Sequence, residues 1–384
     1  MFAFSESDKM LREQARSFAK KELAAGAKER SKQSTVPPEI MKKVAAMGYT
    51  GLCVPEKYGG QEVSAISRGI VIEEISKVDF NIGVLTSHCQ IISAMILRGS
   101  EELAVEWVPR IISTDKIGSI AITEPDCGND IGAIKTRAVR DRDNYIINGE
   151  KTSISRGSHA DICLVFAKTD PTAGTKGLTQ FLVPLDLPGI SREPLIDMGT
   201  KLFARASINF DNVRIPEINR LGEEGQGFAR QFLGSINIDR AVLGLQVLGA
   251  AQASLDEAIA FSKQRVAFGY PIAKYEGVSF KIAEAATLLE AARWLCYYTL
   301  WLGDQGLPAY KQGAMCKWWC PQIAVDIIHN CMLIHGQVAY TEELPIEQRL
   351  RDVIGTEFGD GTAEIMKINI ARQIIGQEAI PYIK

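Results

Sequence analysis

Two cysteines and a few histidines are the residues whose spacing first raises the question of metal chemistry. Cys316 and Cys320 lie one helical turn apart, with Trp318 and Trp319 between them. Zinc sites combine such a pair with further Cys or His ligands at short, regular spacing. The 4 histidines form no HxxxH pair, so we interpret the two cysteines as core residues and expect no metal site.

A glycine-rich segment raises the second question, whether the chain binds a nucleotide through a phosphate-binding loop. Residues 222–227 read Gly-Glu-Glu-Gly-Gln-Gly, which lacks the spacing of a dinucleotide loop and would turn two carboxylates toward the phosphates. No predicted strand of a βαβ unit precedes this segment. The sequence also contains no GxSxG nucleophile elbow and no P-loop, which excludes the commonest serine hydrolase and NTPase classes.

The charge balance is that of an ordinary globular protein. The 384 residues include 46 acidic and 43 basic side chains, which gives a formal net charge of −3. A hydrophobic share of 46% beside 23% charged residues indicates neither a disordered nor a membrane-embedded chain. We therefore expect no nucleic-acid partner.

Cysteine usage and the apolar runs bear on the cellular compartment. The 8 cysteines are scattered along the chain, as is typical of reduced thiols and not of a disulfide framework. Residues 1–25 have no apolar core of signal-peptide length. The most apolar run, residues 241–255, contains Gln246 and Gln252 and is too short to span a bilayer. We expect a cytoplasmic protein without membrane insertion.

The elements that must position a site fall into three predicted domains, residues 1–117, 118–226 and 227–384. The first has the apolar spacing of helices. The second contains short β-rich stretches separated by turn residues, at 119–123, 137–139, 145–148, 162–167, 179–184 and 207–214. The third predicts long helices at 228–265, 276–302, 311–335 and 364–377, which we expect to pack as a four-helix bundle. The fold class is thus mainly α with a middle β domain.

Six segments resemble one family in their order and spacing. Residues 121–125 read Ala-Ile-Thr-Glu-Pro and residues 128–130 read Gly-Asn-Asp, which resembles the TEPxxGSD signature of acyl-CoA dehydrogenases. The other matching segments are 210–216, 221–228, 264–272, 351–352 and 361–365. The resemblance covers nearly the whole chain. It implies the family's helical N-terminal domain, middle β domain and C-terminal four-helix bundle.

The resemblance also implies a chemistry and partners. A family member binds FAD and an acyl-CoA thioester. A carboxylate removes the α-proton while the β-hydrogen leaves as hydride to flavin N5, and hydrogen bonds to the thioester carbonyl make the α-proton acidic. A homotetramer, and an electron-transferring flavoprotein as electron acceptor, are the corresponding expectations.

Asp360 stands where the family has its base, but the motif is altered. The usual Tyr-Glu-Gly-Thr reads Gly-Asp-Gly-Thr at residues 359–362. The shorter side chain retracts the carboxylate by about 1.5 Å, one C–C bond, whereas proton transfer requires heavy-atom contact near ~3 Å. Asp239, directly before Arg240, resembles the position from which the isovaleryl-CoA branch supplies its base. It stays open as the alternative base or as a helix-surface residue paired with a nearby cation.

The cofactor site that the resemblance implies is spread over several segments. Ile122 and Thr123 are expected to line the flavin ring, and Ser155 to place a hydroxyl at N5. The full expected set is Ile122, Thr123, Ser153, Ser155, Arg265, Phe268, Glu276, Leu333, Gly336, Gln337, Thr362 and Glu364. Of these, Arg265, Phe268 and the segment 333–337 are expected to reach the FAD of a neighbouring subunit.

Several of these positions depart from the family pattern. Ser153 replaces a shielding Trp, Glu276 replaces a Gln, and residues 333–337 read Leu-Ile-His-Gly-Gln where the family has QxxGG. Weakened or lost FAD binding is therefore an open alternative. The expected substrate contacts are Asn129, Asn237, Arg240, Gly361 and Arg372, with Asn129 in place of Ser and Asn237 in place of Asp.

Three of the departures concern the space beside the flavin. Small or shortened side chains at Gly359, Ser153 and Asp360 leave room for a bulky acyl group, such as the ring of cyclohexanecarboxyl-CoA or of a cyclohexenyl analogue. Two placements stay open for Trp294, Trp318 and Trp319: they fill this room instead, or they lie at the subunit interface. The alternatives are a nitroalkane-oxidase-like flavoenzyme with an Asp base and a catalytically silent acyl-CoA-binding homologue.

Overall fold

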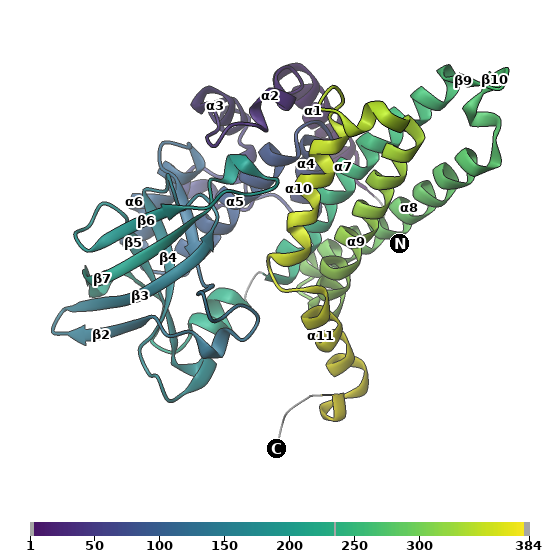
Figure 1. Ribbon diagram of the computed structural model, residues 1–384. Coiled ribbons are helices and arrows are strands. Elements are labelled where there is room, and N and C mark those ends of the chain that lie inside the picture. The colour runs from purple at the N-terminus through teal and green to yellow at the C-terminus, as the bar shows by residue number, and fades with distance from the viewer. Residues whose placement is uncertain (1–3, 234–235, 380–384) are drawn as a thin grey trace.

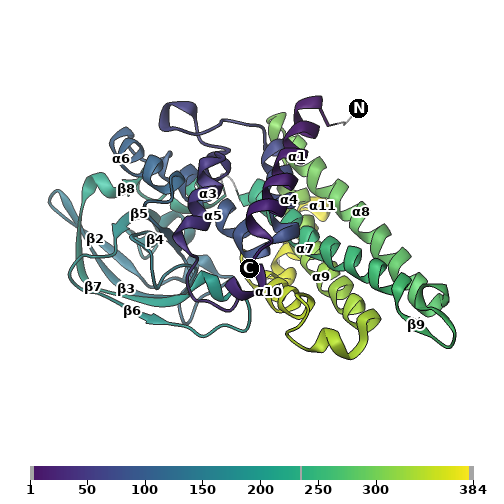
Figure 2. The same ribbon diagram turned by 90° about the horizontal axis from the view of Figure 1, so that it is seen from above.

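The chain forms two helical parts and one sheet. The computed structural model describes residues 4–233 and 236–379. Figure 1 shows the sheet on one side and the long C-terminal helices on the other. From above, the N-terminal helices lie over the junction between them (Figure 2). The predicted fold class, mainly α with a middle β domain, is confirmed.

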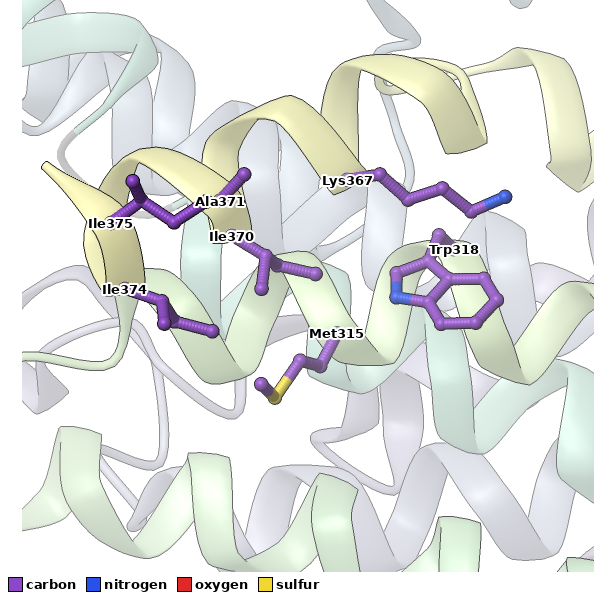
Figure 3. A pocket seen from close by; sticks show the side chains of 7 residues that line it. All are labelled: Met315, Trp318, Lys367, Ile370, Ala371, Ile374 and Ile375. Atoms are coloured by element: carbon purple, nitrogen blue, oxygen red, sulfur yellow. The ribbon is translucent and has the colours of Figure 1, made fainter. Parts of the chain in front are cut away.

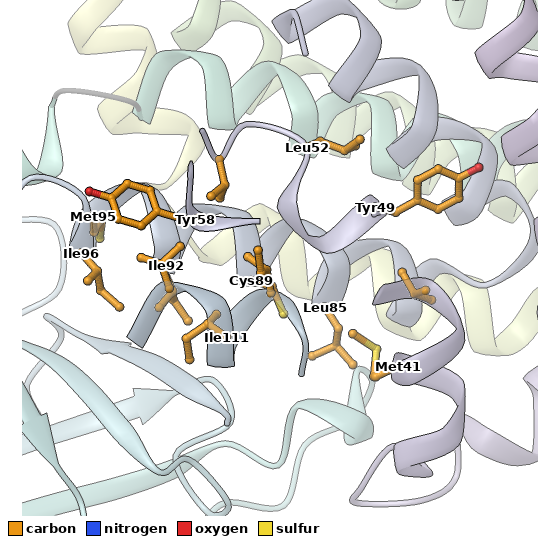
Figure 4. Packing of buried hydrophobic residues seen from close by; sticks show 14 of the residues in the cluster. Met41, Tyr49, Leu52, Tyr58, Leu85, Cys89, Ile92, Met95, Ile96 and Ile111 are labelled. Atoms are coloured by element: carbon orange, nitrogen blue, oxygen red, sulfur yellow. The ribbon is translucent and has the colours of Figure 1, made fainter. Parts of the chain in front are cut away.

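The N-terminal part consists of helices that begin at polar capping residues. Ser5, Ser64, Asp79 and Ser100 each accept a hydrogen bond from a backbone N–H in the first turn of the helix that follows, which satisfies donors that a helix start leaves open. The helices are α1 (Glu6–Phe18), α2 (Ala27–Arg30), α3 (Pro38–Ala46), α4 (Ala65–Val78), α5 (Phe80–Ile96) and α6 (Glu101–Ile112). Most of their buried apolar side chains, including Leu85 and Ile92, pack into one cluster (Figure 4), whereas Ile70, Ile72 and Phe80 pack into the core of the C-terminal helices.

A mixed sheet of eight strands follows, with the order β6-β7-β3-β2-β4-β5-β8 and with β1 beside β4. The strands are β1 (Gly118–Ala121), β2 (Arg137–Asp141), β3 (Asn144–Ile154), β4 (Ile162–Lys168), β5 (Leu178–Pro184), β6 (Ile190–Pro194), β7 (Ala206–Pro216) and β8 (Arg220–Leu221). All six predicted stretches are strands. Strands β6 and β8 were not predicted, because β6 has no fully buried residue and β8 is 2 residues long.

The C-terminal part is a bundle of long helices. They are α7 (Ile236–Gln264), α8 (Glu276–Asp304), α9 (Tyr310–His335), α10 (Ile346–Phe358) and α11 (Ala363–Ile375), with a small hairpin of β9 (Val266–Ala267) and β10 (Tyr270–Pro271) between α7 and α8. The predicted helix 228–265 begins as a π-helical segment, Gly227–Phe232, and includes residues 234–235, which lie outside the described chain. The four predicted helices are present, and α10 was missed.

The burial of Cys316 and Cys320 agrees with their interpretation as core residues. Cys316 and Cys320 are fully buried, and Cys320 Sγ lies 3.5 Å from Cys296 Sγ. All of the cysteines are free thiols. None of the helices within residues 4–233 and 236–379 is long and apolar enough to cross a membrane.

Asp352 joins α10 to both other parts of the molecule. Its carboxylate is 1% exposed and accepts hydrogen bonds from Asn81 Nδ2 on α5 (2.7 Å), from Gln348 Nε2 (3.1 Å) and from the backbone N–H of Thr200 in the middle domain. Burial raises the pKa of Asp352, although these donors act against the shift. The position of α10, and of the loop that follows it, is thereby fixed relative to the sheet and to α5.

A close approach of α4 and α7 gives a first prediction. A Cβ on Gly249 of α7 would lie 2.8 Å from the Glu73 carbonyl oxygen and 3.0 Å from the Lys77 nitrogen of α4. Because backbone atoms cannot rotate away, we expect Gly249→Ala to lower the free energy of unfolding by about 1–3 kcal/mol in chemical denaturation. Gly277→Ala in α8 is the control, since its Cβ would meet no atom of the described residues within 4 Å. Equal stability of the two variants would contradict the close packing.

Candidate active site

Asp360 lies in the tight turn between α10 and α11. Its backbone is left-handed (φ +56°), as is that of Gly361 (φ +96°), and its side chain is exposed. A Cβ on Gly361 would lie 2.6 Å from Met366 Cε and 3.6 Å from Arg240 Nη2. The turn therefore requires glycine at 361 and presents the carboxylate of Asp360 to solvent.

Arg240 holds this turn from α7. Its Nη2 donates to the Asp360 carbonyl oxygen at 3.3 Å, and the side chain is 4% exposed. Burial lowers the pKa of Arg240, and nearby Asp360 acts against the shift. Its Nε and Nη1 have no hydrogen-bond partner within residues 4–233 and 236–379, and the same holds for the buried Oδ1 of Asn237. Buried polar atoms are normally paired, so these atoms fit a bound ligand.

Asp239, the neighbour of Arg240, faces another helix. Its Oδ1 lies 2.9 Å from Arg68 Nη2 on α4, and the two side chains are 8% and 6% exposed. Arg68 also donates to the side-chain oxygen of Gln90. Burial alone would lower the pKa of Arg68, but the charge of Asp239, the nearby Cys53 and the hydrogen bond to Asp239 together outweigh it, and the pKa is raised. Asp239 is thus engaged in a buried ion pair, whereas Asp360 is not.

A buried lysine fixes the loop after β1, which carries Ile122 and Thr123. Lys151 of β3 is fully buried, and its Nζ donates to the Ile122 carbonyl oxygen (2.8 Å) and to Glu124 Oε1 (2.9 Å). Burial lowers the pKa of Lys151 although Glu124 opposes the shift. Burial would raise the pKa of Glu124, but Lys151 and the hydrogen bonds outweigh it and lower that pKa. The loop is therefore held by a buried charge pair.

Several predicted site residues gather around this loop. The Thr152 N–H donates to the Thr123 carbonyl oxygen at 2.9 Å, and the exposed Ser153 comes next, in a left-handed conformation (φ +57°). From the same domain, Asn129 Nδ2 donates to Thr362 Oγ1 at 3.2 Å. Thr362 is the N-cap residue of α11, two positions after Asp360. The sheet and the Asp360 turn are thus joined directly.

The other predicted cofactor residues lie at the far end of the bundle. Figure 1 shows the β9–β10 hairpin at the tip of α7 and α8, away from the sheet and from α11. Phe268 in this hairpin is 94% exposed, and Leu333 near the end of α9 is 56% exposed. The rise of an α-helix separates residues 317 and 335 of α9 by roughly 27 Å. One chain does not bring Arg265, Phe268, Glu276 or the segment 333–337 to Asp360. Arg372, exposed in the last turn of α11, also lies away from the turn.

The residue types of both groups fit a flavin dinucleotide. Ile122 offers an apolar side chain and Thr123 a hydroxyl on the loop after β1, and Ser155 offers a hydroxyl directly after β3. These types suit a ring with polar nitrogens. In the far group, the guanidinium of Arg265 suits a diphosphate and Phe268 an aromatic ring. Glu364, exposed at the start of α11, has a lowered pKa because its own N–H and the Thr362 hydroxyl donate to it. When bound, FAD supplies a hydride acceptor.

Comparisons with known proteins agree with this geometry. Models of the N-terminal, middle and C-terminal domains of acyl-CoA dehydrogenases match residues 5–115, 119–213 and 225–375. The chain is 36% identical to an acyl-CoA dehydrogenase of Bacillus subtilis over 370 residues, 96% of this chain and 97% of the relative. A structure described as PigA with FAD and proline superposes with a TM-score of 0.93 at 29% identity, covering 98% of this chain and 100% of that one.

A further solved structure is described as the electron transferring flavoprotein of Acidaminococcus fermentans. It matches with a TM-score of 0.93 at 32% identity, covering 98% of this chain and 99% of that one. Fold and site together define an FAD-dependent oxidoreductase that acts on CH–CH bonds. The chain belongs to the acyl-CoA dehydrogenase family.

Two buried lysines at the site were missed from the sequence. Lys151 secures the loop after β1, and Lys317 of α9 donates from Nζ to the Thr356 carbonyl oxygen of α10 at 2.8 Å. A signal existed for Lys317, because it is the one charged residue in the sequence 312–325. A lone charge in an apolar helical run points to a specific buried partner.

The Lys151–Glu124 pair gives a prediction on stability and cofactor content. Glu124→Gln leaves a buried ammonium without its counter-charge, so we expect a loss of about 3–5 kcal/mol in the free energy of unfolding and less FAD per chain in the purified protein. The matched control is Asp126→Asn in the same loop, whose ion pair with Lys135 is about three-quarters exposed and should leave both quantities unchanged. Equal FAD content in both variants would show that the pair does not organise the loop.

Proposed function

We propose that this FAD-dependent acyl-CoA dehydrogenase acts on a bulky acyl-CoA, of the alicyclic kind represented by cyclohexanecarboxyl-CoA, with Asp360 as its base. The observation that carries the proposal is the open space beside the base. Gly359 has no side chain, and a Cβ built on it would meet nothing within 4 Å in the described part of the chain. A ring next to the α-carbon needs such space, and a straight chain does not.

The three tryptophans that stayed open as occupants of this space have other neighbours in the structure. Trp294 of α8 stacks on Phe4 at a ring distance of 6.0 Å. Trp318 lies in a groove of about 390 Å³ between α9 and α11, with Lys367 over its ring (Figure 3). Trp319 packs against the core of the bundle. Their positions support an open site at Gly359.

The turn that carries Asp360 provides the groups for proton abstraction and for polarisation of the thioester carbonyl. The exposed carboxylate of Asp360 takes the α-proton of the thioester, and the backbone N–H of Asp360 donates to the thioester carbonyl, which makes that proton more acidic. The N–H groups of Arg240 and the oxygen of Asn237 that have no partner in the described part of the chain contact the substrate. Asp239 stays ion-paired with Arg68 and takes no part in proton transfer.

The far group of cofactor residues points to a shared site. Arg265, Phe268 and the segment 333–337 would meet the FAD of a second chain, since their own Asp360 lies at the other end of the bundle. A homotetramer is the assembly we propose, with an electron-transferring flavoprotein as the electron acceptor, in the cytoplasm. The exposed rings and aliphatic side chains of this group support burial in an assembly.

The substrate proposal is tested by the anaerobic visible spectrum of the purified protein. We expect cyclohexanecarboxyl-CoA to bleach the flavin band faster than butyryl-CoA, because the space at Gly359 accepts the ring. Faster bleaching by butyryl-CoA would overturn the bulky-substrate proposal. A flavin band that no acyl-CoA bleaches, together with oxygen uptake on nitroethane, would favour the nitroalkane oxidase alternative. A colourless protein that takes up no FAD would favour the silent homologue.

The assignment of the base is tested by a matched pair of isosteric variants. Asp360→Asn should lower the rate of flavin reduction by about 10²–10⁴-fold, the usual contribution of a general base, with the FAD content unchanged. Asp239→Asn should lower thermal stability, since it leaves Arg68 unpaired, but retain most of the rate per bound FAD. The opposite pattern would name Asp239 as the base.

A further inference from the structure

Lys317 is a buried ammonium that the proposed reaction does not yet use. It lies on α9 and is 1% exposed. Its Nζ donates to the carbonyl oxygen of Thr356 at 2.8 Å. Burying a lysine is costly in free energy unless its charge meets a specific partner. The contact of Lys317 with the end of α10 must therefore offset this cost.

The partner of Lys317 lies in the last turn of α10. The final carbonyl groups of a helix have no partner within it, and the helix dipole makes this end negative. Helix α10 has no basic residue of its own in its last turn. Lys317 supplies the missing cation from a neighbouring helix. It binds the carbonyl oxygen of Thr356, which lies four residues before Asp360.

The turn that follows is held at its other end by Arg240. The Arg240 guanidinium bonds the Asp360 carbonyl oxygen, so two buried cations, from α7 and α9, fix residues 356 and 360. The left-handed backbone of Asp360 is a strained conformation for a residue with a side chain, and such conformations persist only where the surroundings enforce them.

We propose that Lys317 is a positioning residue for the base: its ammonium holds the C-terminal end of α10 and, through it, the carboxylate of Asp360. The inference rests on the proposed role of Asp360. A shift of the base by about 1 Å can cost 10²-fold in rate, and the shorter side chain of an aspartate makes the position of its backbone more important.

The charges around Lys317 make its hydrogen bond to the end of α10 sensitive to pH. Asp360 and Glu357 face it from the end of α10, Arg240 faces it from α7, and the thiol of Cys320 lies on its own helix. Burial, with Arg240 adding to the effect, lowers the pKa of Lys317 to about 8, while the two carboxylates act against the shift. Above this pH the hydrogen bond to Thr356 loses its charge assistance, which is roughly half of its strength.

The first test compares pH profiles of flavin reduction by a saturating acyl-CoA in the purified holoenzyme. We expect the wild-type rate to fall severalfold above about pH 8, and Lys317→Arg to lose this fall, because arginine stays protonated. Lys317→Met should be slower by about 10²-fold in the rate of reduction, with a smaller change in KM. Lys367→Met removes an exposed lysine nearby and should keep the wild-type profile. An alkaline fall shared by all four proteins would overturn the proposal.

The second test needs no substrate and uses thermal unfolding of the wild type and of Lys317→Met. The lowered pKa means that the unfolded chain binds a proton at Lys317 that the folded chain has lost, between about pH 8 and the ordinary lysine value of about 10.4. The Tm of the wild type relative to the variant should therefore rise across this window and stay constant below it. A constant difference throughout would show that Lys317 does not titrate as proposed.

The two tests separate this inference from the proposed function. Suppose that Asp360→Asn retains the wild-type rate of flavin reduction while the Tm difference rises with pH. The proposal that Asp360 is the base is then rejected, but the titration of buried Lys317 is supported. If Lys317→Met does not fold, the comparison of the wild type with Lys317→Arg decides. Identical pH profiles of these two proteins would overturn the positioning role.

Discussion

The pairing of the last carbonyl groups of α10 is the constraint on which the candidate site depends. Thr356 in the last turn is half-buried, and a carbonyl group that is removed from water without a partner costs on the order of 1–3 kcal/mol. Here Lys317 and Arg240 approach from two other helices, and Asp352 anchors the helix to α5 and to the middle domain. The turn that carries Asp360 is thus defined by contacts with every part of the molecule.

The length of the bundle helices explains why the cofactor residues form two groups. The near group lies on the loop after β1, at the end of β3 and at the start of α11, whereas the far group lies at the tip of α7 and α8 and at the end of α9. In the proposed assembly, a single chain would therefore hold one group of each of two sites. Exposed Phe268 and Leu333 are apolar side chains that a lone chain leaves in water. An assembly that covers them would complete the site at the same time, which couples burial of apolar surface to cofactor binding.

Local sequence patterns predicted most of the helices and strands, but they did not predict contacts between residues far apart in the chain. Apolar spacing predicted the helices α7, α8, α9 and α11, and β-rich stretches predicted the strands β1 to β5 and β7. Helix α10 was missed because its buried positions, Ile346 and Val353, are few among charged residues. The resemblance assigned Asn129 and Arg240 to the substrate, Thr362 to the cofactor and Asp360 to the base, but it did not predict which of them touch. In the structure Asn129 contacts Thr362 and Arg240 contacts Asp360. No local pattern indicated that Asp239 faces Arg68, because that partner lies 171 positions earlier and on another helix.

The shortened base and the missing neighbour are best understood together. An aspartate places its carboxylate about 1.5 Å further from the substrate than a glutamate does, which by itself would separate base and α-proton. A Cβ at position 359 would meet nothing within 4 Å in the described part of the chain, so in the proposed reaction a ring would approach the turn and close the gap. Each departure alone would weaken the proposed site, and the two together would favour a wider substrate. The cations at the end of α10 then matter more than in a site with a longer base, since a short side chain has fewer rotamers with which to correct a displaced backbone.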